Sequence, residues 1–475
     1  LPRKSGWWTT VSRSPRWTHN PLKPARRVRL WLEPAMSTKL VVSFKHFLLA
    51  CLFWLPLGAQ AALPVQHWTT AQGARVYFVE SRQLPMLDLA VSFPAGSARD
   101  PARKEGLAQL THALLDQGAG GWSDTRIAHE MADVGAVLSG SFDRDRATVS
   151  LRTLSSEAEK NRALGTFLRV LQQPDFPQAV VAREKPRALA GIRESEADPG
   201  QVASKAFFQA LYGTHPYAHD EAGEAGSIQQ LSRADLQAFY RTHYTAPNAV
   251  IALMGDVSRP EAERIAAQIS AGLTAGKVVP VLPVPVAATP VAQRITHPSA
   301  QSHVLVGALG MARDDPDFFP LFVGNYVLGG GGFDSQLMRE IRDKRGYAYS
   351  AYSYFLPMGM AGPFQLGLQT QAKQADDALK VAIATLRDFV NAGPSEAELK
   401  QAKDNLTGGF PLRIDSNRKI LDYLSMIGFY QLPLDYLDTW VSKVDAVTVR
   451  DVKDAFARRL NPDALVTVVV GSDAR

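Results

Sequence analysis

Leu231-Ser232-Arg233-Ala234-Asp235-Leu236 has a counterpart 216 residues later, at Val447-Thr448-Val449-Arg450-Asp451-Val452. In both segments a Ser or Thr stands three residues before an Asp and opens an apolar face, a pattern typical of a helix N-cap. About twenty residues further on, each copy ends in a β-branched run closed by glycine, at residues 249–255 and 465–471. The shared offset predicts that the chain contains two copies of one domain.

A third match lies near the start of each copy, where Ala-Arg-Asp-Pro at 98–101 corresponds to Ala-Arg-Asp-Asp-Pro at 312–316. Between the copies, residues 278–291 hold four prolines among small and β-branched residues without a helical period, which is typical of an extended linker. We therefore expect a first domain over residues 63–276, a Pro-rich linker over 277–293 and a second domain over 294–475.

The pattern of apolar residues predicts the elements of each copy. Predicted strands lie at residues 75–80, 87–93 and 302–309. Residues 157–171 and 376–390 have the spacing of amphipathic helices, and Ser395-Glu396-Ala397-Glu398 opens another with a capping box. Strands at both ends of a copy, with helices between them, predict an α+β fold in which each domain is a mostly antiparallel sheet covered by helices.

Composition and charge place the chain among soluble globular proteins. It has 475 residues, of which 46% are hydrophobic and 21% charged. The formal net charge is +6, but ten Lys and Arg against one acid give residues 1–61 a charge of +9, which leaves −3 for residues 62–475. A mildly acidic body does not favour nucleic acid as a partner.

The N-terminal residues have the pattern of an export signal. Residues 1–35 are rich in Arg, Pro and Trp, and we interpret them as an extension upstream of a true start at Met36. Residues 36–61 contain two lysines, an apolar run at 47–57 and then Ala59-Gln60-Ala61, the three regions of a secretory signal peptide. The apolar run is too short to span a bilayer. We expect cleavage after Ala61 and a periplasmic protein.

The single cysteine, Cys51, lies inside the apolar run of this signal. We interpret it as a small apolar residue of the leader. The alternative is a lipoprotein cysteine after Leu48-Leu49-Ala50, and the apolar sequence that continues beyond it argues against that assignment. If cleavage follows Ala61, the mature protein has no thiol and therefore no disulfide and no cysteine nucleophile.

Residues 106–113 read Gly-Leu-Ala-Gln-Leu-Thr-His-Ala. They resemble the helix of the pitrilysin-type (M16) zinc peptidases that carries His-x-x-Glu-His after Gly-Leu-Ala, where two His bind zinc and the Glu activates the bound water. On this pattern Gln109 and Ala113 take the ligand positions, and His112 takes the position of the base. An amide is a poor zinc ligand and alanine is none, so we expect no metal on this chain.

Further segments extend the resemblance over the whole exported body: residues 194–199, His215-Pro216-Tyr217, Tyr244, Pro247-Asn248, Gly255-Asp256-Val257, 328–337 and 342–349. Each match alone is weak, and their order and spacing together are specific. The third zinc ligand of the family, a Glu, falls at Gly191, or at Glu194 if the alignment shifts by three residues. Neither position restores the missing imidazoles.

Other histidines offer weaker metal sites or bases. His215 and His219, with Glu221 nearby, have a His-x-x-x-His spacing, but Pro216 favours a turn over a helix. We expect His129 and Glu130 to lie on a solvated helix edge. His112 could be a stray catalytic base, but we expect simple surface or groove packing, because the neighbouring motif positions offer no nucleophile.

The glycine run consists of Gly329, Gly330, Gly331 and Gly332. It lacks the Lys-Ser/Thr that follows a phosphate-binding loop. We interpret it as a tight passage in which the backbone approaches a neighbour or an extended peptide.

In the second half the resemblance includes Arg342 and Tyr349, which are seven residues apart. In the family such a pair reaches across to the zinc site, contacts the substrate peptide and helps to stabilise the tetrahedral intermediate. A fixed cation and a phenol donor aimed at a developing oxyanion suit that role. The structural alternative is a solvated helix charge and a strand aromatic.

The resemblance implies a division of labour between two subunits, of which one brings zinc and the other the Arg–Tyr pair. We predict a non-catalytic, substrate-binding subunit of a periplasmic heterodimeric metalloendopeptidase. Its partner would be an M16 subunit with an intact His-x-x-Glu-His motif and zinc, and its substrate an unfolded peptide added as a strand at a sheet edge. We expect neither nucleic acid nor a stable membrane anchor. The alternatives are a peptide-binding or scaffold protein without a peptidase role, and an autonomous zinc peptidase with a rearranged site.

Overall fold

The computed structural model describes residues 64–287 and 289–472. The predicted upstream extension (1–35), the signal peptide (36–61) and Cys51 lie outside the described residues. Within the described ranges, no helix has both the length and the apolar character needed to cross a membrane.

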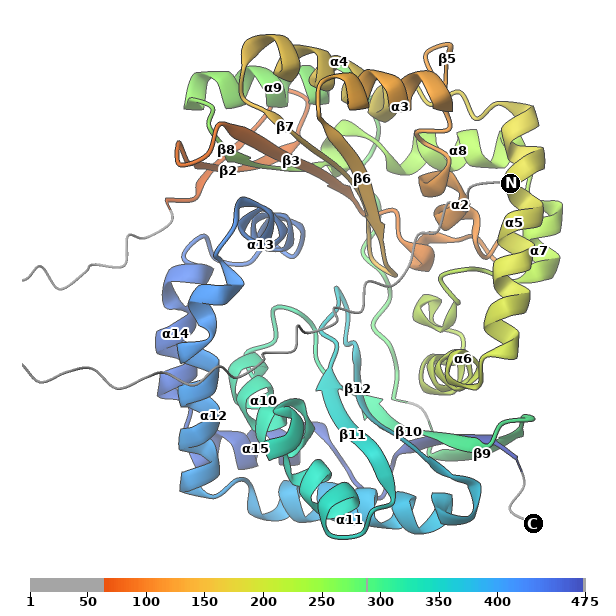
Figure 1. The fold of residues 1–475 in the computed structure, drawn as a ribbon, viewed down its shortest axis with the longest axis vertical. Helices are drawn as coiled ribbons and strands as arrows, with labels where there is room; N and C mark the ends of the chain where they lie inside the picture. The colour runs from red at the N-terminus through yellow and green to blue at the C-terminus, as the bar shows by residue number, and fades with distance from the viewer. Residues whose placement is uncertain (1–63, 288, 473–475) are drawn as a thin grey trace, which may run out of the picture. The chain divides into compact units, whose positions relative to one another are not determined.

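The first half forms a six-stranded sheet in the order β1-β2-β8-β3-β7-β6, with β6 at one edge (Figure 1). Only β2 and β8 run parallel, and every other neighbouring pair is antiparallel. Its strands are β1 (Gln66–Thr69), β2 (Arg75–Glu80), β3 (Met86–Phe93), β6 (Val137–Phe142), β7 (Ala147–Leu154) and β8 (Val250–Gly255). A separate two-stranded hairpin joins β4 (Gly118–Ala119) to β5 (Trp122–Ser123).

The second half forms a five-stranded sheet in the order β11-β12-β10-β13-β9, in which only β13 and β9 run parallel. Its strands are β9 (Val291–Thr296), β10 (Gln301–Leu309), β11 (Ala348–Phe355), β12 (Pro363–Gln371) and β13 (Val466–Gly471). The predicted α+β class with two mostly antiparallel sheets is therefore confirmed. The predicted strands correspond to β2, β3 and β10.

Helices cover both sheets. The first half contains α2 (Leu107–Ala113), α3 (Asp124–Asp133), α4 (Glu157–Gln172), α5 (Gln178–Ala197), α6 (Pro199–Tyr212), α7 (Ala225–Gln230), α8 (Arg233–His243) and α9 (Arg259–Gly272). The second half contains α10 (Phe318–Asn325), α11 (Ala375–Ala392), α12 (Glu396–Gly408), α13 (Asn417–Phe429), α14 (Tyr436–Ala446) and α15 (Val449–Arg459). The predicted amphipathic helices correspond to α4 and α11.

The repeated segments at residues 231–236 and 447–452 form two equivalent capping boxes. At α8, Asp235 N donates to Ser232 Oγ at 3.2 Å, and Ser232 N donates back to Asp235 Oδ2 at 2.8 Å. At α15, Thr448 and Asp451 make the same pair of bonds, at 3.1 and 2.9 Å. In each copy the helix leads to a fully buried strand, β8 or β13. The sequence repeat is thus a structural repeat.

The two copies exchange one helix each. Helix α6 packs on β10 and β13 of the second sheet, while α13 packs on β2, β3 and β8 of the first (Figure 1). On α13, Ser425 Oγ lies 2.8 Å from Ser92 Oγ of β3. A Cβ added to Gly428 would lie 2.6 Å from both Tyr77 and Val250, so the helix meets the sheet at its glycine. Because each sheet is covered by a helix of the other copy, the two halves share their cores.

Residues 275–287 and 289–290 contain no helix or strand. This extended segment is fastened to the first half, since Val279 N donates to Asn248 Oδ1 at 3.0 Å and Arg99 Nη1 donates to Pro280 O at 2.7 Å. Strand β9 begins at Val291, so the last residues of the predicted linker pair with β13 in the second sheet.

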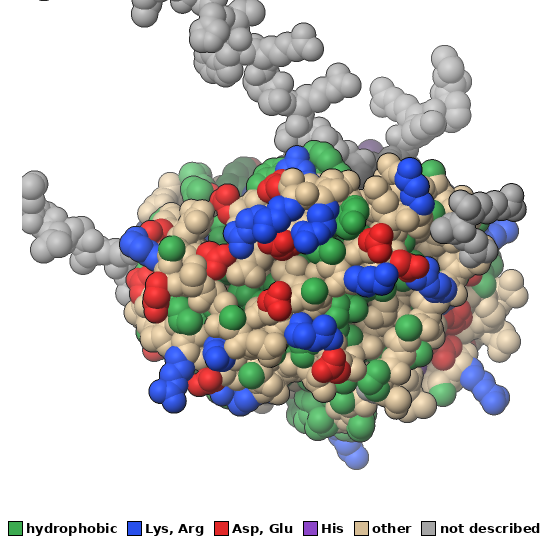
Figure 2. Space-filling model, turned by 90° about the horizontal axis from the view of Figure 1, so that it is seen from below, with side chains coloured by type: hydrophobic (Ala, Val, Ile, Leu, Met, Phe, Trp, Pro, Cys, Tyr) green, Lys and Arg blue, Asp and Glu red, His purple; other side chains and the backbone are tan. Residues whose placement is uncertain are grey.

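Surface charges of both signs alternate on the face shown in Figure 2. Elsewhere along the helices, charges of opposite sign are paired, such as Lys400 with Asp404 at 2.6 Å and Arg450 with Asp454 at 3.6 Å. This face therefore offers no continuous basic patch of the kind that binds a phosphate backbone.

Candidate functional site

The N-cap residue of helix α2 is Gly106, whose φ of 92° lies in the left-handed region that favours glycine. Asp100 holds the first turn, because its Oδ2 accepts a hydrogen bond from Gly106 N and its Oδ1 one from Ala108 N, both at 2.7 Å. Burial raises the pKa of Asp100 to about 7. The helix that resembles the zinc-motif helix is thus fixed by a buried carboxyl group at its N-terminus.

Three of the sequence-predicted site positions meet in one pocket of about 280 Å³. Gln109 and Ala113 reach it from α2, and Gly191 reaches it from α5, as do Arg187 and Glu184 one and two turns earlier. The alignment therefore brings together residues that are neighbours in space.

The donors around this pocket do not fit zinc. The three aligned positions offer one amide, one methyl group and no side chain. The carboxylate of Glu184 is engaged with Arg187 and Arg183, both at 2.7 Å, and Glu194 is exposed and does not line the pocket. Across the described ranges no three His, Cys, Asp or Glu side chains are grouped so that they could hold a metal ion.

His112 lies on α2 but is not among the residues that line this pocket. Its ring stacks on Phe142 of β6 with a centroid distance of 5.9 Å, and a Cβ added to Gly140 would lie 2.6 Å from its Nε2. Its Nδ1 is buried without a hydrogen-bond partner. Burial lowers the pKa of His112 to about 4, so the ring is neutral near pH 7. It packs beneath the edge strand.

His129, His215 and His219, the other histidines considered above, belong to no group of side chains in the described ranges that could hold a metal ion. His215 caps the 3₁₀ turn Pro216–Ala218, so the proline does favour a turn here. Glu221 is paired with Arg144 at 2.5 Å. His129 is exposed on α3, and its neighbour Glu130 is paired with Arg162 at 2.8 Å.

Arg342 and Tyr349 come together in the second half, joined by Phe333. The guanidinium carbon of Arg342 lies 4.7 Å from the centroid of the Phe333 ring and 5.5 Å from that of Tyr349. The two aromatic residues are 64% and 81% exposed. The nearest carboxylate to Arg342 is that of Asp343, at 3.9 Å. We call these three residues the Arg342 cluster.

Two π-helical turns carry the segments around this cluster, η4 (Tyr326–Gly330) and η6 (Met338–Asp343). Such turns are rare and occur frequently at functional sites. The glycine run ends η4, and a Cβ at Gly329 would collide with Ser353 of β11. The run is therefore a close approach to a neighbouring strand, one of the two expectations from the sequence.

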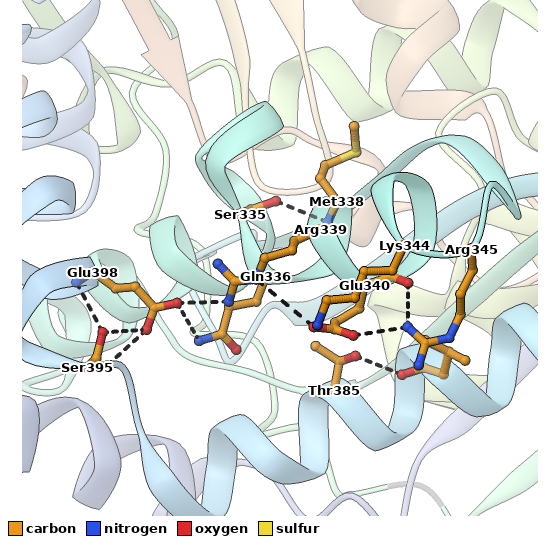
Figure 3. Close-up of polar contacts among 11 residues, drawn as sticks. Ser335, Gln336, Met338, Arg339, Glu340, Lys344, Arg345, Thr385, Ser395 and Glu398 are labelled. Atoms are coloured by element: carbon orange, nitrogen blue, oxygen red, sulfur yellow. Dashed lines mark hydrogen bonds and ion pairs between the residues drawn. The ribbon is translucent and has the colours of Figure 1, made fainter.

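A polar network fixes η6 against α12, as Figure 3 shows. Glu398 Oε1 accepts hydrogen bonds from Arg339 Nη2 at 3.0 Å and Gln336 Nε2 at 3.1 Å. Its Oε2 accepts from Ser395 N at 2.9 Å and closes the capping box of α12, as the sequence predicts. One carboxylate thus starts a helix and holds the turn that contains Arg342.

Two sheet edges differ in how open they are. Strand β11 carries Tyr349 in an irregularity between Ala348 and Ala351. Part of its outer edge is used, because Ala351 N donates to Met338 Sδ at 3.2 Å and Ser353 O accepts from Asn325 Nδ2 at 2.9 Å. Strand β6 pairs only with β7, and its outer edge has no hydrogen bond within the described part of the chain.

Sequence reasoning missed several residues of this site. Phe333 follows the glycine run directly, and an exposed aromatic residue there is a signal that a reading of the sequence could have used. Glu184 and Arg187 pair with each other on α5 beside the pocket, and nothing in their local sequence marks them as pocket residues. For Glu398 the capping box was predicted, but its contacts with Arg339 and Gln336 were not.

Two family models match the chain. Residues 75–223 match "Insulinase (Peptidase family M16)", and residues 230–406 match "Peptidase M16 inactive domain". Among curated proteins, the chain is 24% identical over 433 residues to the "Non-peptidase homolog YmxG" of Helicobacter pylori, covering 90% of this chain and 99% of that protein. It is 26% identical over 410 residues to an "Uncharacterized zinc protease" of Mycobacterium tuberculosis, covering 85% and 92%.

Two solved structures also share this fold. A crystal structure of a peptidase M16 inactive domain from Pseudomonas fluorescens is 41% identical, with a TM-score of 0.84, and covers 87% of this chain and 98% of that one. A protease from Helicobacter pylori shares the fold, with a TM-score of 0.79 at 19% identity over 86% of this chain and all of that one. The chain therefore belongs to the M16 peptidase family and contains both its N-terminal and its inactive C-terminal domain.

Proposed function

We propose that this chain is the non-catalytic, substrate-binding subunit of a periplasmic heterodimeric M16 metalloendopeptidase. It supplies Arg342 and Tyr349 to a zinc site on its partner subunit. The Arg342 cluster carries the proposal, since its cation has only a long contact of 3.9 Å with the carboxylate of Asp343 and its two aromatic rings are largely exposed. The pocket at Gln109, Ala113 and Gly191, by contrast, offers no zinc ligands.

The chemistry of the cluster fits a role in trans. Zinc on the partner would supply an activated water for peptide hydrolysis. On this chain, the guanidinium of Arg342 is held between Phe333 and Tyr349 and is always charged. Together with the exposed phenol of Tyr349, it offers donors to an oxyanion that develops on the scissile carbonyl.

An extended peptide needs a sheet edge to pair with. Strand β6 has an outer edge without hydrogen bonds to other described residues, and its positions are all exposed or half-exposed, which favours it over the partly occupied edge of β11. Main-chain hydrogen bonds to such an edge bind a peptide without demanding a particular sequence.

Co-purification tests the pairing. This chain is mixed with an M16 protein from the same cell that has an intact His-x-x-Glu-His motif, and peptide cleavage is measured for each alone and for both together. We expect cleavage only from the pair. Arg342→Ala and Tyr349→Phe should each lower kcat by about 100-fold, the usual cost of one oxyanion donor.

Arg387→Ala is the matched control, because Arg387 is an exposed arginine of the same half that pairs with Asp463 at 2.7 Å. It should leave the rate of the pair unchanged. An unaltered rate in both cluster variants, cleavage by this chain alone, or no association with the zinc subunit would each refute the proposal.

A second candidate is a peptide-binding or scaffold protein without a peptidase role, which the name of the Helicobacter relative favours. It predicts that peptides bind to this chain while the cluster variants leave every peptidase rate unchanged. An autonomous zinc peptidase is the third candidate, and the donor set around Gln109 argues against it. Stoichiometric, tightly bound zinc in the purified chain would establish it instead.

A further inference from the structure

A larger pocket, of about 490 Å³, lies in the second half and shares no lining residue with the sites described above. It lies between the residues that lead into α10, the turn after α13 and helix α14. Its walls are largely apolar, and they are formed by Phe318, Phe319, Leu432, Pro433 and Tyr436. A concave, mostly apolar cavity of this size with a few polar groups is typical of a ligand site.

Arg313 lines this pocket without a partner for its charge. Its Nε is buried and makes no hydrogen bond, and no carboxylate lies within ion-pair distance among the described residues. The guanidinium carbon lies 5.4 Å from the centroid of the Tyr430 ring. Burial lowers the pKa of Arg313, although the nearby Tyr430, Tyr436 and Asp145 act in the opposite direction. A half-buried cation of this kind is stabilised by an anion that brings hydrogen-bond acceptors.

The charges around Arg313 leave room for an anion. Asp315 is already paired with Arg459 at 2.7 Å, and Asp451 accepts a hydrogen bond from Thr448 N at the start of α15. The second lining cation, Lys443, has no ion pair within the described ranges and lies 5.7 Å from the ring of Phe319. The two lining cations, Arg313 and Lys443, are therefore available to an anion. Of the three lining carboxylates, Asp315 and Asp451 have the partners just named, and Asp314 is the third.

The first copy of the repeat shows what such an arginine binds. Arg99 stands where Arg313 stands in the second copy, and its Nη1 donates to the main-chain oxygen of Pro280 in the extended linker. No segment of the described chain serves Arg313 in this way. The turn beside it also holds Gln431 at a φ of 53°, a conformation unusual for a residue other than glycine and often found at functional sites.

We propose that this pocket binds the C-terminal end of a peptide whose last residue is apolar. The terminal carboxylate lies on Arg313, and the last side chain lies among Phe318, Phe319 and Tyr436. A carboxylate complements the free cation, and the extended linker on Arg99 gives the internal precedent for main-chain oxygen at this position. The inference does not depend on the proposed role in a peptidase.

Isothermal titration calorimetry with the purified full chain tests this. The probes are N-acetyl-Leu-Phe with a free carboxylate and the same peptide as its C-terminal amide. The acid should bind at least about tenfold more tightly, since a hydrogen-bonded ion pair is lost in the amide. Arg313→Gln should abolish that difference, and Arg99→Gln, the equivalent change in the first copy, should preserve it.

A second variant keeps the test valid if Arg313→Gln fails to fold. Ala446 is exposed at the end of α14 and lines the pocket, so Ala446→Trp should block it without removing a charge. We expect it to abolish binding of the acid while thermal unfolding is unchanged. Equal binding of acid and amide, retained binding in a folded Arg313→Gln, or binding of decanoate but not of the peptide would overturn the assignment.

Discussion

Glu398→Ala tests whether the network in Figure 3 positions Arg342. The carboxylate closes the capping box at Ser395 and also accepts from Arg339 and Gln336 on the segment that leads into η6. Removing it therefore frees the start of α12 and the π-helical turn at the same time. Glu398 does not touch the exposed cluster, so it is a positioning residue.

The magnitude follows from the two kinds of contact. Loss of a helix cap costs about 0.5–2 kcal/mol of stability. The ion pair with Arg339 is partly exposed, and such pairs contribute about 0.2–1 kcal/mol. We expect Glu398→Ala to lower the free energy of unfolding by roughly 1–3 kcal/mol, measured by urea denaturation. Glu398→Gln keeps an acceptor for Arg339, so its free energy of unfolding should lie between those of the unaltered protein and Glu398→Ala.

Asp235→Ala is the matched control. Asp235 also closes a capping box, at Ser232, and also pairs with a partly exposed cation, Lys104, at 2.5 Å. It should therefore cost a similar amount of stability, but it does not contact η6. In the reconstituted pair, we expect Glu398→Ala alone to lower kcat by about tenfold or more, because small displacements of an oriented group are costly. Equal rates for the two variants would refute the positioning role.

Three further perturbations follow from the fold and the first pocket. The pKa of His112 in the folded state lies near 4, below its ordinary 6.5. The stability that the neutral ring contributes is therefore fully present above about pH 6.5 and is lost as the pH falls toward 4. His112→Leu should remove up to about 3 kcal/mol of this acid-induced loss, measured by comparing urea unfolding at pH 7 and pH 4.5. Gly428→Ala should lower stability by about 1–3 kcal/mol, because its Cβ would press on the first sheet 2.6 Å away. Combining Gln109→His, Ala113→His and Gly191→Glu should create a site that binds zinc with 1:1 stoichiometry in metal analysis.

Controls separate these effects from general damage. Gly165 lies inside α4 and a Cβ there meets nothing within 4 Å, so Gly165→Ala should raise stability by about 0.5–1 kcal/mol. His243, whose pKa burial also lowers to about 4, remains in the His112 variant and accounts for residual acid sensitivity. If the triple variant binds no zinc, Gly191 is not the third ligand position, and the alignment shifted to Glu194 becomes the next test.

Local signals account for what the sequence predicts well. The capping boxes at Ser232 and Thr448 depend on residues three apart, and β8 and β13 are apolar runs of the chain. Both features can therefore be predicted from one sequence without knowledge of the fold. The exchange of α6 and α13 has no such signal. An apolar helix face shows that a helix is covered, and it does not show which of two similar sheets covers it.

The candidate site residues also differ in whether local sequence predicts their contacts. Gln109 and Ala113 lie four residues apart on one helix, so their meeting could be expected from helix geometry. Phe333 joins Arg342 from across a bend, and its approach depends on the π-helical turn η6. A turn of this kind has no sequence pattern comparable to the 3.6-residue period of an ordinary helix.

The candidate site residues of the two halves differ in what they contact. In the first half, Gln109, Ala113 and Gly191 line a pocket that offers no set of zinc ligands, and Glu184 and Arg187 neutralise each other beside it. In the second half, Phe333 and Tyr349 remain largely exposed around a cation. Exposed aromatic rings bury little surface and so add little to folding. Folding therefore does not account for the Arg342 cluster, which is left to be explained by what binds it.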